Sequence, residues 1–335
     1  MEIRMISFTR KGYALGETLA ALLSASHCVT LSKGFGADKT SLSGWTAEAF
    51  AEAEGLIFIG AAGIAVRSIA PHLASKISDP GVLVVDDCGR FVIPILSGHL
   101  GGANELAAAV AELLQAIPVI TTATDSNGVF AVDSWARRQG LMIANPERIK
   151  WVSARLLAGE TIRIRSQFPI SGTPPRGIEL TDDKEYDVLV SIKTRGREGV
   201  LRLIPPVCAL GVGCRRDIPA EAVETAFQAL LGKGSIAQQA VCRVCSINMK
   251  AGEPGILAFC RARRLPFECF SAQTLAQAEG SFASSAFVRQ VTGVDNVCER
   301  SAVCGCPGGG DLIVKKNAGN GVTMALAMPR VILSF

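Results

Sequence analysis

The 335-residue sequence lacks a long apolar run, and its first residues do not resemble an export signal. The most hydrophobic windows are broken by charge, glycine or proline within about 18 residues, which is too short to cross a bilayer. The opening stretch MEIRMISFTRKG carries acidic and basic side chains and has no apolar core. These absences predict a soluble, cytoplasmic protein that does not bind membranes.

Strong charge is also missing from the sequence. The formal net charge is +4, charged residues make up 19% of the chain, and no run of five or six like charges occurs. This balance gives no support for nucleic-acid binding, and 49% hydrophobic residues argue against disorder. A mild positive excess does suit an acidic small molecule.

Histidine is scarce, with only three in the chain, and one of them stands in an unusual place. His99 lies in the glycine-rich stretch SGHLGGAN, where an apolar strand pattern changes to a helix pattern. An imidazole has an ordinary pKa near 6.5, so it can exchange protons at neutral pH. His99 is therefore a candidate catalytic base, and the alternative is a histidine that holds its own loop by local hydrogen bonds.

Cysteine is abundant by contrast, with eleven residues. An odd count without an export signal argues against a disulfide framework. Cys242 and Cys245 have the spacing of metal and redox sites, and Cys304 and Cys306 form a second close pair. Because CRVCSI has the pattern of a buried strand, we interpret the cysteines as reduced, buried thiols and predict no metal site.

Short apolar strands alternate with helical patterns along most of the chain. This predicts a multidomain α/β fold of mostly parallel sheets flanked by helices, with a small α+β middle segment. The expected divisions are an N-terminal α/β domain at 1–138, a middle segment at 139–205 and a C-terminal α/β domain at 206–335. The turn at 87–90, between two extended runs, predicts a hairpin, and IPVITTATD predicts a further strand.

A second glycine turn, GAAGIAVR, follows an apolar strand and opens a helix. Backbone N–H groups at such a helix start can hold an anion, and Gly60 and Gly63 would let it approach. The motif has neither a Walker lysine nor a full dinucleotide fingerprint. A tight strand-to-helix turn without a ligand is the plain alternative.

Basic residues recur at the expected strand ends of the C-terminal domain. Strand ends of an α/β sheet meet at one crevice, so these side chains predict an anion site, although each alone could be a solvated surface charge. The residues are Arg215, Arg216, Lys250, Lys315 and Lys316, with Glu253 beside Lys250.

Several long stretches together resemble one known family. GAAGIAVRSIAPHL, SDPGVLVVDDCGRFVIPILSGHLGGANELA and VITTATD are similar to the core of the CbiG family of cobalamin-biosynthesis proteins. The segments LGVGCRRDIPAEAV, SINMKAGEPGILAF, VTGVDNVCERSA and LIVKKNAGNGVTMALA resemble the C-terminal domain of that family, which is also similar to CobE. The resemblance covers nearly the whole chain and is weakest in the middle segment.

The resemblance implies a cobalt-precorrin-5A hydrolase of the anaerobic cobalamin route. Such an enzyme opens a δ-lactone on its cobalt-corrinoid substrate and releases acetaldehyde. Cobalt would arrive within the substrate, so no protein-bound cofactor is expected. A homodimer and contacts with neighbouring pathway enzymes are both left open.

The chemistry of lactone opening then suggests roles for the residues singled out above. His99 is the expected base, and Arg67 or the N–H groups of Gly101 and Gly102 are the expected oxyanion donors. The expected substrate contacts are Gly60, Gly63, Ser97, Gly98, Gly101, Gly102, Asn104, Asp125 and the strand-end residues of the C-terminal domain. The alternatives are a non-catalytic tetrapyrrole carrier and a nucleotide-dependent enzyme built on the Gly60 turn.

Overall fold

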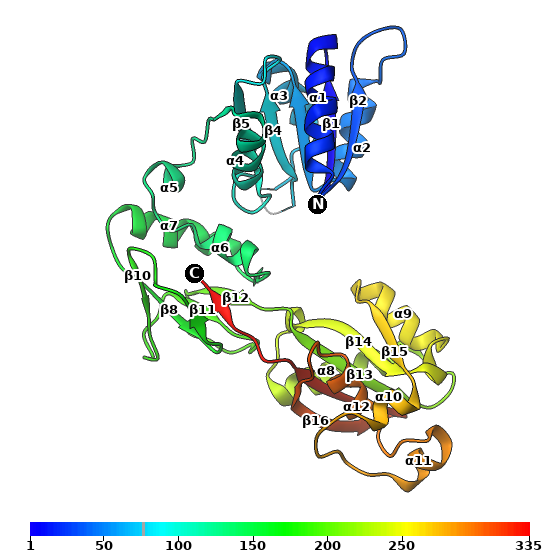
Figure 1. Ribbon diagram of the computed structural model, residues 1–335. Coiled ribbons are helices and arrows are strands. Elements are labelled where there is room, and N and C mark those ends of the chain that lie inside the picture. The colour runs from blue at the N-terminus through cyan, green and yellow to red at the C-terminus, as the bar shows by residue number, and fades with distance from the viewer. Residues whose placement is uncertain (76–77) are drawn as a thin grey trace. The chain divides into compact units, whose positions relative to one another are not determined.

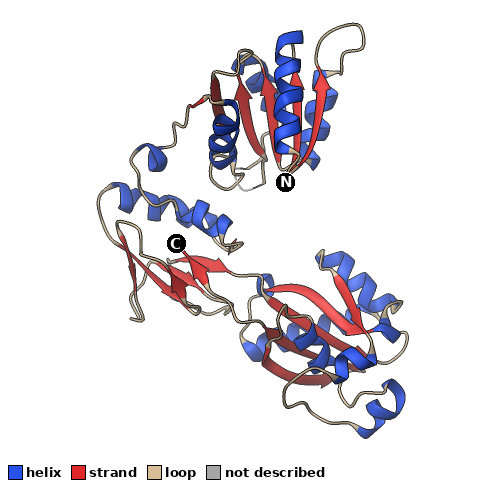
Figure 2. Ribbon diagram, in the orientation of Figure 1, coloured by secondary structure: helices blue, strands red, loops and turns tan. Residues whose placement is uncertain are grey.

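The chain folds into two compact units that each combine sheets and helices. The computed structural model describes residues 1–75 and 78–335. One unit holds residues 1–137 and 149–160, and the other holds 138–148 and 161–335. Strands alternate with helices in both (Figure 2), and three sheets of five or six strands are mostly parallel. The predicted α/β class is confirmed.

The first unit is built on a six-stranded sheet in the order β2-β1-β3-β4-β5-β6. The first four of these strands are parallel, β5 is antiparallel to β4, and β6 is parallel to β5. Every residue of β3 and β4 is buried, which explains their continuous apolar sequences. The strands are β1 (Glu2–Ser7), β2 (Cys28–Lys33), β3 (Gly55–Ile59), β4 (Gly81–Val85), β5 (Phe91–Leu96) and β6 (Ile117–Pro118).

Helices cover both faces of this sheet (Figure 1). Apolar side chains of α1 and α4 pack in one core cluster, and those of α2 and α3 pack in another on the opposite face. The helices on these faces are α1 (Arg10–Leu23), α2 (Leu42–Glu52), α3 (Ala62–Ile69) and α4 (Ala103–Leu114), with a 3₁₀ turn at Ala70–His72. The chain continues after β6 with α5 (Ala123–Ser126), α6 (Val132–Arg138) and α7 (Ile149–Leu157), and a 3₁₀ turn at Pro146–Arg148 belongs to the second unit.

The predicted hairpin between β4 and β5 is confirmed, and it reverses the direction of the chain. The Asp86 carboxylate accepts hydrogen bonds from the backbone N–H groups of Arg90 and Phe91, both at 2.6 Å. Gly89 takes the positive φ of +67° that the tight turn needs. Because β5 runs antiparallel to β4, the chain after Leu96 emerges where β1, β3 and β4 begin.

The strand predicted across IPVITTATD is mostly wrong. Only Ile117–Pro118 pairs with the sheet, as β6. The Val119 N–H still donates to the Val92 carbonyl of β5 at 2.8 Å, and the chain then leaves the sheet to form the short helix α5 from Ala123. Asp125 therefore lies on a helix instead of at a strand end.

The second unit contains a five-stranded sheet in the order β10-β8-β11-β12-β7, parallel except for β7. This sheet falls inside the stretch 139–205, while the predicted domain boundaries themselves stay predictions. Its strands are β7 (Met142–Ile143), β8 (Ile162–Ser166), β10 (Ile178–Leu180), β11 (Val188–Val190) and β12 (Leu201–Ile204).

A second sheet of this unit has the order β15-β14-β13-β17-β16. The strands β13, β14 and β15 are parallel, and β17 is antiparallel to both of its neighbours. The strands are β13 (Cys208–Cys214), β14 (Val241–Ile247), β15 (Phe267–Phe270), β16 (Asp311–Gly319) and β17 (Val322–Met328).

Helices and one small ribbon complete the second unit. The ribbon pairs β9 (Ile170–Ser171) with β18 (Leu333–Ser334), so the last residues are tied to a segment far away in sequence. The helices are α8 (Ala220–Gly234), α9 (Pro254–Arg263), α10 (Ala272–Ala276), α11 (Ala286–Thr292) and α12 (Cys298–Cys304), with 3₁₀ turns at Gln238–Ala240 and Asn248–Lys250. Across residues 1–75 and 78–335, no helix has the length and apolar character needed to cross a membrane.

Candidate functional site

The SGHLGGAN stretch is a compact turn between β5 and α4 that folds against the start of β4. Ser97 and Gly102 adopt positive φ angles of 52° and 76°. A Cβ atom on Gly101 would lie 2.4 Å from the Cβ of Ser97, and one on Gly98 would lie 2.6 Å from Oδ1 of Asn104. The glycines are therefore needed for the turn to close on itself and on the Asn104 side chain.

His99 projects from this turn and is held by side chains of two later helices. Its Nδ1 lies 2.7 Å from the hydroxyl of Ser134 on α6, and its Nε2 lies 2.9 Å from the hydroxyl of Thr124 on α5. The carboxylate of Asp125 is 3.5 Å from Nε2. Both ring nitrogens thus have hydrogen-bonding partners, and one side of the ring faces an acid.

Asn104 fixes that acid from the first turn of α4. Its side-chain amide donates hydrogen bonds of 2.9 Å to Asp125 Oδ2 and to the hydroxyl of Thr122. Asn104 is buried, whereas the Asp125 side chain remains 37% exposed, so the carboxylate is still open to a ligand. The predicted residues Ser97, Gly98, His99, Gly101, Gly102, Asn104 and Asp125 are therefore brought together.

The acid also selects the protonation pattern of the imidazole. A neutral imidazole has one N–H donor and one acceptor nitrogen. A carboxylate beside Nε2 favours the proton on that nitrogen, which leaves Nδ1 to accept a hydrogen bond from Ser134. In that tautomer, Nδ1 is the basic nitrogen and the Ser134 hydroxyl is its hydrogen-bond partner.

One predicted oxyanion donor is already engaged within the turn. The N–H of Gly102 donates to the carbonyl of His99 at 3.0 Å, which closes the turn. The side chain of Arg137 lies against Gly102 and pairs with Glu105. The expectation that the Gly102 N–H would serve the substrate is therefore wrong, while the role of Gly101 stays a prediction. The hydroxyl oxygen of Ser97 is buried and has no hydrogen-bond partner within the described residues.

The Gly60 turn lies at the opposite end of the strands of the same sheet. The N–H of Gly60 donates to the carbonyl of Val85, at the end of β4, whereas Gly101 lies against Gly81, where β4 begins. Four residues of strand separate these points, which is about 13 Å. A Cβ atom on Gly63 would lie 3.6 Å from the Arg67 guanidinium, so this side chain folds back onto the Gly60 turn. Gly60, Gly63 and Arg67 therefore do not share a site with His99, and Arg67 is not placed to be its oxyanion donor. The reversal of β5 is the reason.

In the second unit, the predicted residues Lys250 and Glu253 lie together after the carboxyl end of β14. Lys250 Nζ lies 2.8 Å from Glu253 Oε2, and the other carboxylate oxygen accepts a 3.0 Å hydrogen bond from the Ile218 N–H. Burial opposes ionisation of Glu253, but the hydrogen bonds from Lys250 and Ile218 prevail and lower its pKa. Burial raises the pKa of the neighbouring Cys214 thiol, and Lys250 opposes that shift. Lys250 is therefore held next to the end of β13.

Arg215 and Arg216 lie on the turn after β13 and are exposed. The N–H of Arg215 donates to the Gly321 carbonyl at 3.0 Å, and its side chain lies against Gly321. The guanidinium groups are thus presented at the same sheet edge as Lys250.

Lys315 and Lys316 do not end a strand, so their predicted position is wrong. The strand β16 continues to Gly319, and both lysines lie at a register shift in its middle. The N–H of Lys316 is bonded to the buried carboxylate of Glu299 on α12. They lie two strands away from β13 and are displaced from its end.

Two glycines precede the arginine pair in the sequence. Gly211 and Gly213 lie within β13. A Cβ atom on Gly211 would be 1.8 Å from the carbonyl oxygen of Cys298, so this glycine lets α12 pack directly on the sheet. Gly211 is therefore a packing residue.

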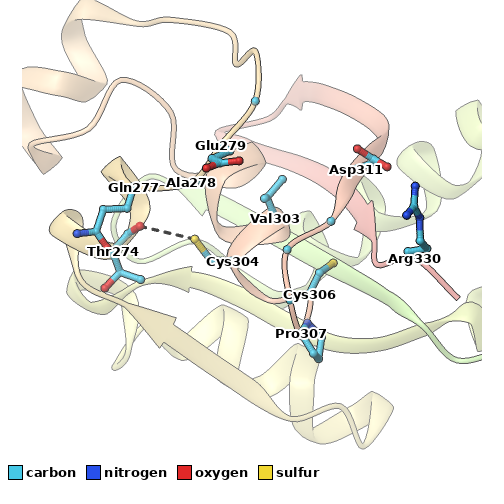
Figure 3. Close-up of a pocket in the computed structure, with 14 residues that line it drawn as sticks. Thr274, Gln277, Ala278, Glu279, Val303, Cys304, Cys306, Pro307, Asp311 and Arg330 are labelled. Atoms are coloured by element: carbon cyan, nitrogen blue, oxygen red, sulfur yellow. Dashed lines mark hydrogen bonds between the residues drawn. The ribbon is translucent and has the colours of Figure 1, made fainter.

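A hollow of about 1060 Å³ in the second unit contains none of the predicted site residues. Figure 3 shows Glu279, Asp311 and Arg330 at its rim and Cys304 with Cys306 at its wall. Two carboxylates against one guanidinium do not suit a polycarboxylate ligand.

The cysteines are all free thiols. Cys208, Cys242, Cys245 and Cys306 lie close enough to influence one another, and burial raises the pKa of Cys208 to about 12 and of Cys306 to about 11. Buried thiols of this kind stay protonated and unreactive near neutral pH.

Sequence reasoning missed Ser134, Thr124 and Thr122. The two threonines precede Asp125 in the hydroxyl-rich stretch TTATDS, and this composition was the one sequence signal that pointed to them. Nothing in the pattern around Ser134 points to His99, which is 35 residues away.

Comparison with known proteins shows which family the chain is similar to. Residues 44–125 match the family model described as cobalamin synthesis G N-terminal, and residues 208–327 match cobalamin synthesis G C-terminus. A cobalt-precorrin-5A hydrolase from Salmonella typhimurium is 35% identical over 313 residues, 88% of this chain and 89% of the relative. One from Priestia megaterium is 33% identical over 83% of this chain and 79% of its own length. Protein CobE from Sinorhizobium is 35% identical over 121 residues, 36% of this chain and 79% of CobE.

Proposed function

The chain belongs to the cobalamin synthesis G family, and on this premise we propose that it hydrolyses cobalt-precorrin-5A. It opens the δ-lactone of this substrate and releases acetaldehyde, which gives cobalt-precorrin-5B. The observation that carries the proposed site is the His99 cluster, where an oriented imidazole, a fixed carboxylate and two hydroxyl groups meet. The cytoplasm is the proposed location.

His99 is the proposed base of the reaction. Opening a lactone requires removal of a proton from the attacking hydroxyl, which is water in the simplest case. With its Nε2 proton directed to Thr124 and Asp125, the ring accepts that proton at Nδ1, and Asp125 stabilises the resulting imidazolium. The same nitrogen can then return a proton to the departing oxygen.

Release of acetaldehyde completes the proposed sequence. Ring opening leaves a hydroxyl on a two-carbon fragment. Loss of its proton breaks the adjoining carbon–carbon bond in a retro-aldol sense, and the electron pair is taken up by the cobalt macrocycle. Cobalt belongs to the substrate in this scheme, and no protein-bound cofactor is invoked.

The cationic group of the second unit is the proposed contact for the acidic side arms of the substrate. Arg215 and Arg216 are exposed and free to form paired hydrogen bonds with carboxylates. Lys250 lies at the same edge, held by Glu253.

The test is acetaldehyde release from the lactone intermediate by the purified protein. His99→Gln should lower turnover by about 10²-fold or more, because it removes the proton acceptor. His72→Gln is the matched control, since His72 lies against the Phe50 ring outside the cluster and its loss should leave turnover unchanged. Normal turnover of a folded His99→Gln variant would contradict the assigned base.

The same measurements distinguish a hydrolase from a carrier without catalytic activity. A carrier would bind the corrinoid tightly and release no acetaldehyde, and its affinity for the corrinoid would be the same in the His99→Gln variant. Absence of aldehyde with competent substrate and wild-type protein would overturn the hydrolase proposal.

A further inference from the structure

Ser134 occupies the position that a nucleophile for His99 must occupy. It lies in the first turn of α6, and its Oγ is 2.7 Å from Nδ1 of the imidazole. This is a short hydrogen bond between a hydroxyl and a ring nitrogen. The contact joins residues 35 apart in sequence, so the fold and not the local chain creates it.

The direction of this hydrogen bond is set by the other side of the ring. Asp125 lies 3.5 Å from Nε2 and is itself held at 2.9 Å by Asn104. Because the acid keeps the proton on Nε2, the lone pair of Nδ1 faces Ser134 and accepts the hydroxyl proton. An acid, an imidazole and a serine hydroxyl therefore stand in the order that activates serine in hydrolases.

Burial argues against water as the attacking group. Ser134 is 9% exposed and the His99 side chain 14% exposed, and both ring nitrogens already have protein hydroxyl partners. A water molecule activated by His99 would first have to displace Ser134 or Thr124. The serine needs no such displacement.

We propose that Ser134 is the nucleophile that opens the lactone and that the reaction passes through an acyl-enzyme. This inference rests on the proposed function. The Ser134 Oγ forms a bond to the lactone carbonyl carbon, and its proton passes to His99 Nδ1. The ring carbon–oxygen bond then breaks, and the departing oxygen takes the electron pair and that proton.

Water completes the cycle. It attacks the serine ester, gives a proton to His99 and releases the carboxylic acid, while Ser134 regains its proton from the imidazole. The hydroxyl on the two-carbon fragment is free from the first step onwards, so acetaldehyde can leave while the macrocycle is still attached to Ser134. No co-reactant other than water is consumed.

The first test traps the serine in the wild-type protein. Diisopropyl fluorophosphate should add once, with loss of fluoride, and peptide mapping should locate the adduct at Ser134. His99→Gln should slow the labelling by about 10²-fold, because the serine hydroxyl then has no base to activate it. Labelling that is absent from the folded wild type, or that is equally fast in His99→Gln, would overturn the proposal.

The second test uses the substrate itself. Wild-type enzyme quenched in acid during turnover should carry a hydroxylamine-sensitive adduct on Ser134, with the substrate mass or that mass less acetaldehyde. Ser134→Ala should lower the rate of acetaldehyde release by about 10²-fold or more. Ser126→Ala is the matched control, since Ser126 is an exposed serine of the neighbouring α5.

The outcomes separate this proposal from the hydrolase assignment. Acetaldehyde release by Ser134→Ala at the wild-type rate would leave the hydrolase function intact and show that water attacks directly. Labelling of Ser134 without aldehyde from any protein would instead remove the hydrolase function. Should Ser134→Ala fail to fold, the trapping experiments on wild type and Ser134→Cys still decide, because neither removes the nucleophilic side chain.

Discussion

At the scale of single residues, two acids of this protein have different roles. Asp125 orients an imidazole and remains partly open to solvent. Glu253 is almost fully buried and is satisfied by Lys250 and by the backbone of Ile218. The first is placed for chemistry, and the second holds a cation at the end of a strand.

The environment of Glu253 predicts a pH-dependent contribution to stability. Its pKa is lowered in the folded state, so the ionised form stabilises folding above the unfolded pKa of about 4.3, and this stabilisation is lost as the pH falls through the folded value. Glu253→Gln should lower the free energy of unfolding by about 2 kcal/mol at pH 7. Urea denaturation of the wild type and of Glu253→Gln at pH 7 and at pH 3.5 measures the difference in their free energies of unfolding and its dependence on pH. A deficit that stays constant between these pH values would contradict the assigned ionisation.

At the scale of elements, close packing of α12 on β13 depends on one missing side chain. A Cβ atom on Gly211 would meet backbone of α12 at 1.8 Å, and no flexible side chain is there to move away. The helix would have to lift from the sheet, which would also disturb the Ser301 hydroxyl that bonds to the Cys245 carbonyl.

Gly211→Ala should therefore lower the free energy of unfolding by about 3 kcal/mol. Gly232→Ala is the matched control, because Gly232 lies in α8 with open space around it. Alanine there should leave stability unchanged or raise it by up to about 1 kcal/mol, since alanine has the higher helix propensity. Denaturant unfolding of the two variants gives the comparison, and equal stability would argue against the tight α12 contact.

The direction of one strand also decides the composition of the candidate site. The hairpin at Asp86 turns β5 back, so the SGHLGGAN turn lies where the parallel strands begin. The Gly60 turn lies where they end. Two motifs that are similar in sequence therefore lie at opposite ends of the strands of one sheet.

At the scale of the whole molecule, the thiols are distributed between surface and interior. Of the eleven cysteines, Cys28 and Cys88 are exposed, and the others are buried or half-buried. Burial raises the pKa values of thiols such as Cys208 and Cys260, which keeps them protonated.

This distribution predicts the reactivity of the native protein. At pH 7.5, two thiols should react quickly with Ellman's reagent, and all eleven should react in guanidinium chloride. Replacing Cys28 and Cys88 by serine should remove the fast phase. A fast phase of four or more thiols in the native wild type would contradict the observed burial.

The sequence by itself determined most of the elements, the mostly parallel sheets and the candidate SGHLGGAN turn, because apolar periodicity, glycine and proline act over short distances. It also singled out His99, Asn104 and Asp125 as candidates. Only the tertiary structure decided that Ser134 completes the His99 cluster, that Arg67 lies on the far edge and that Lys315 and Lys316 lie inside a strand. Those facts depend on strand direction and register, which are set by contacts between residues distant in sequence and leave no local pattern.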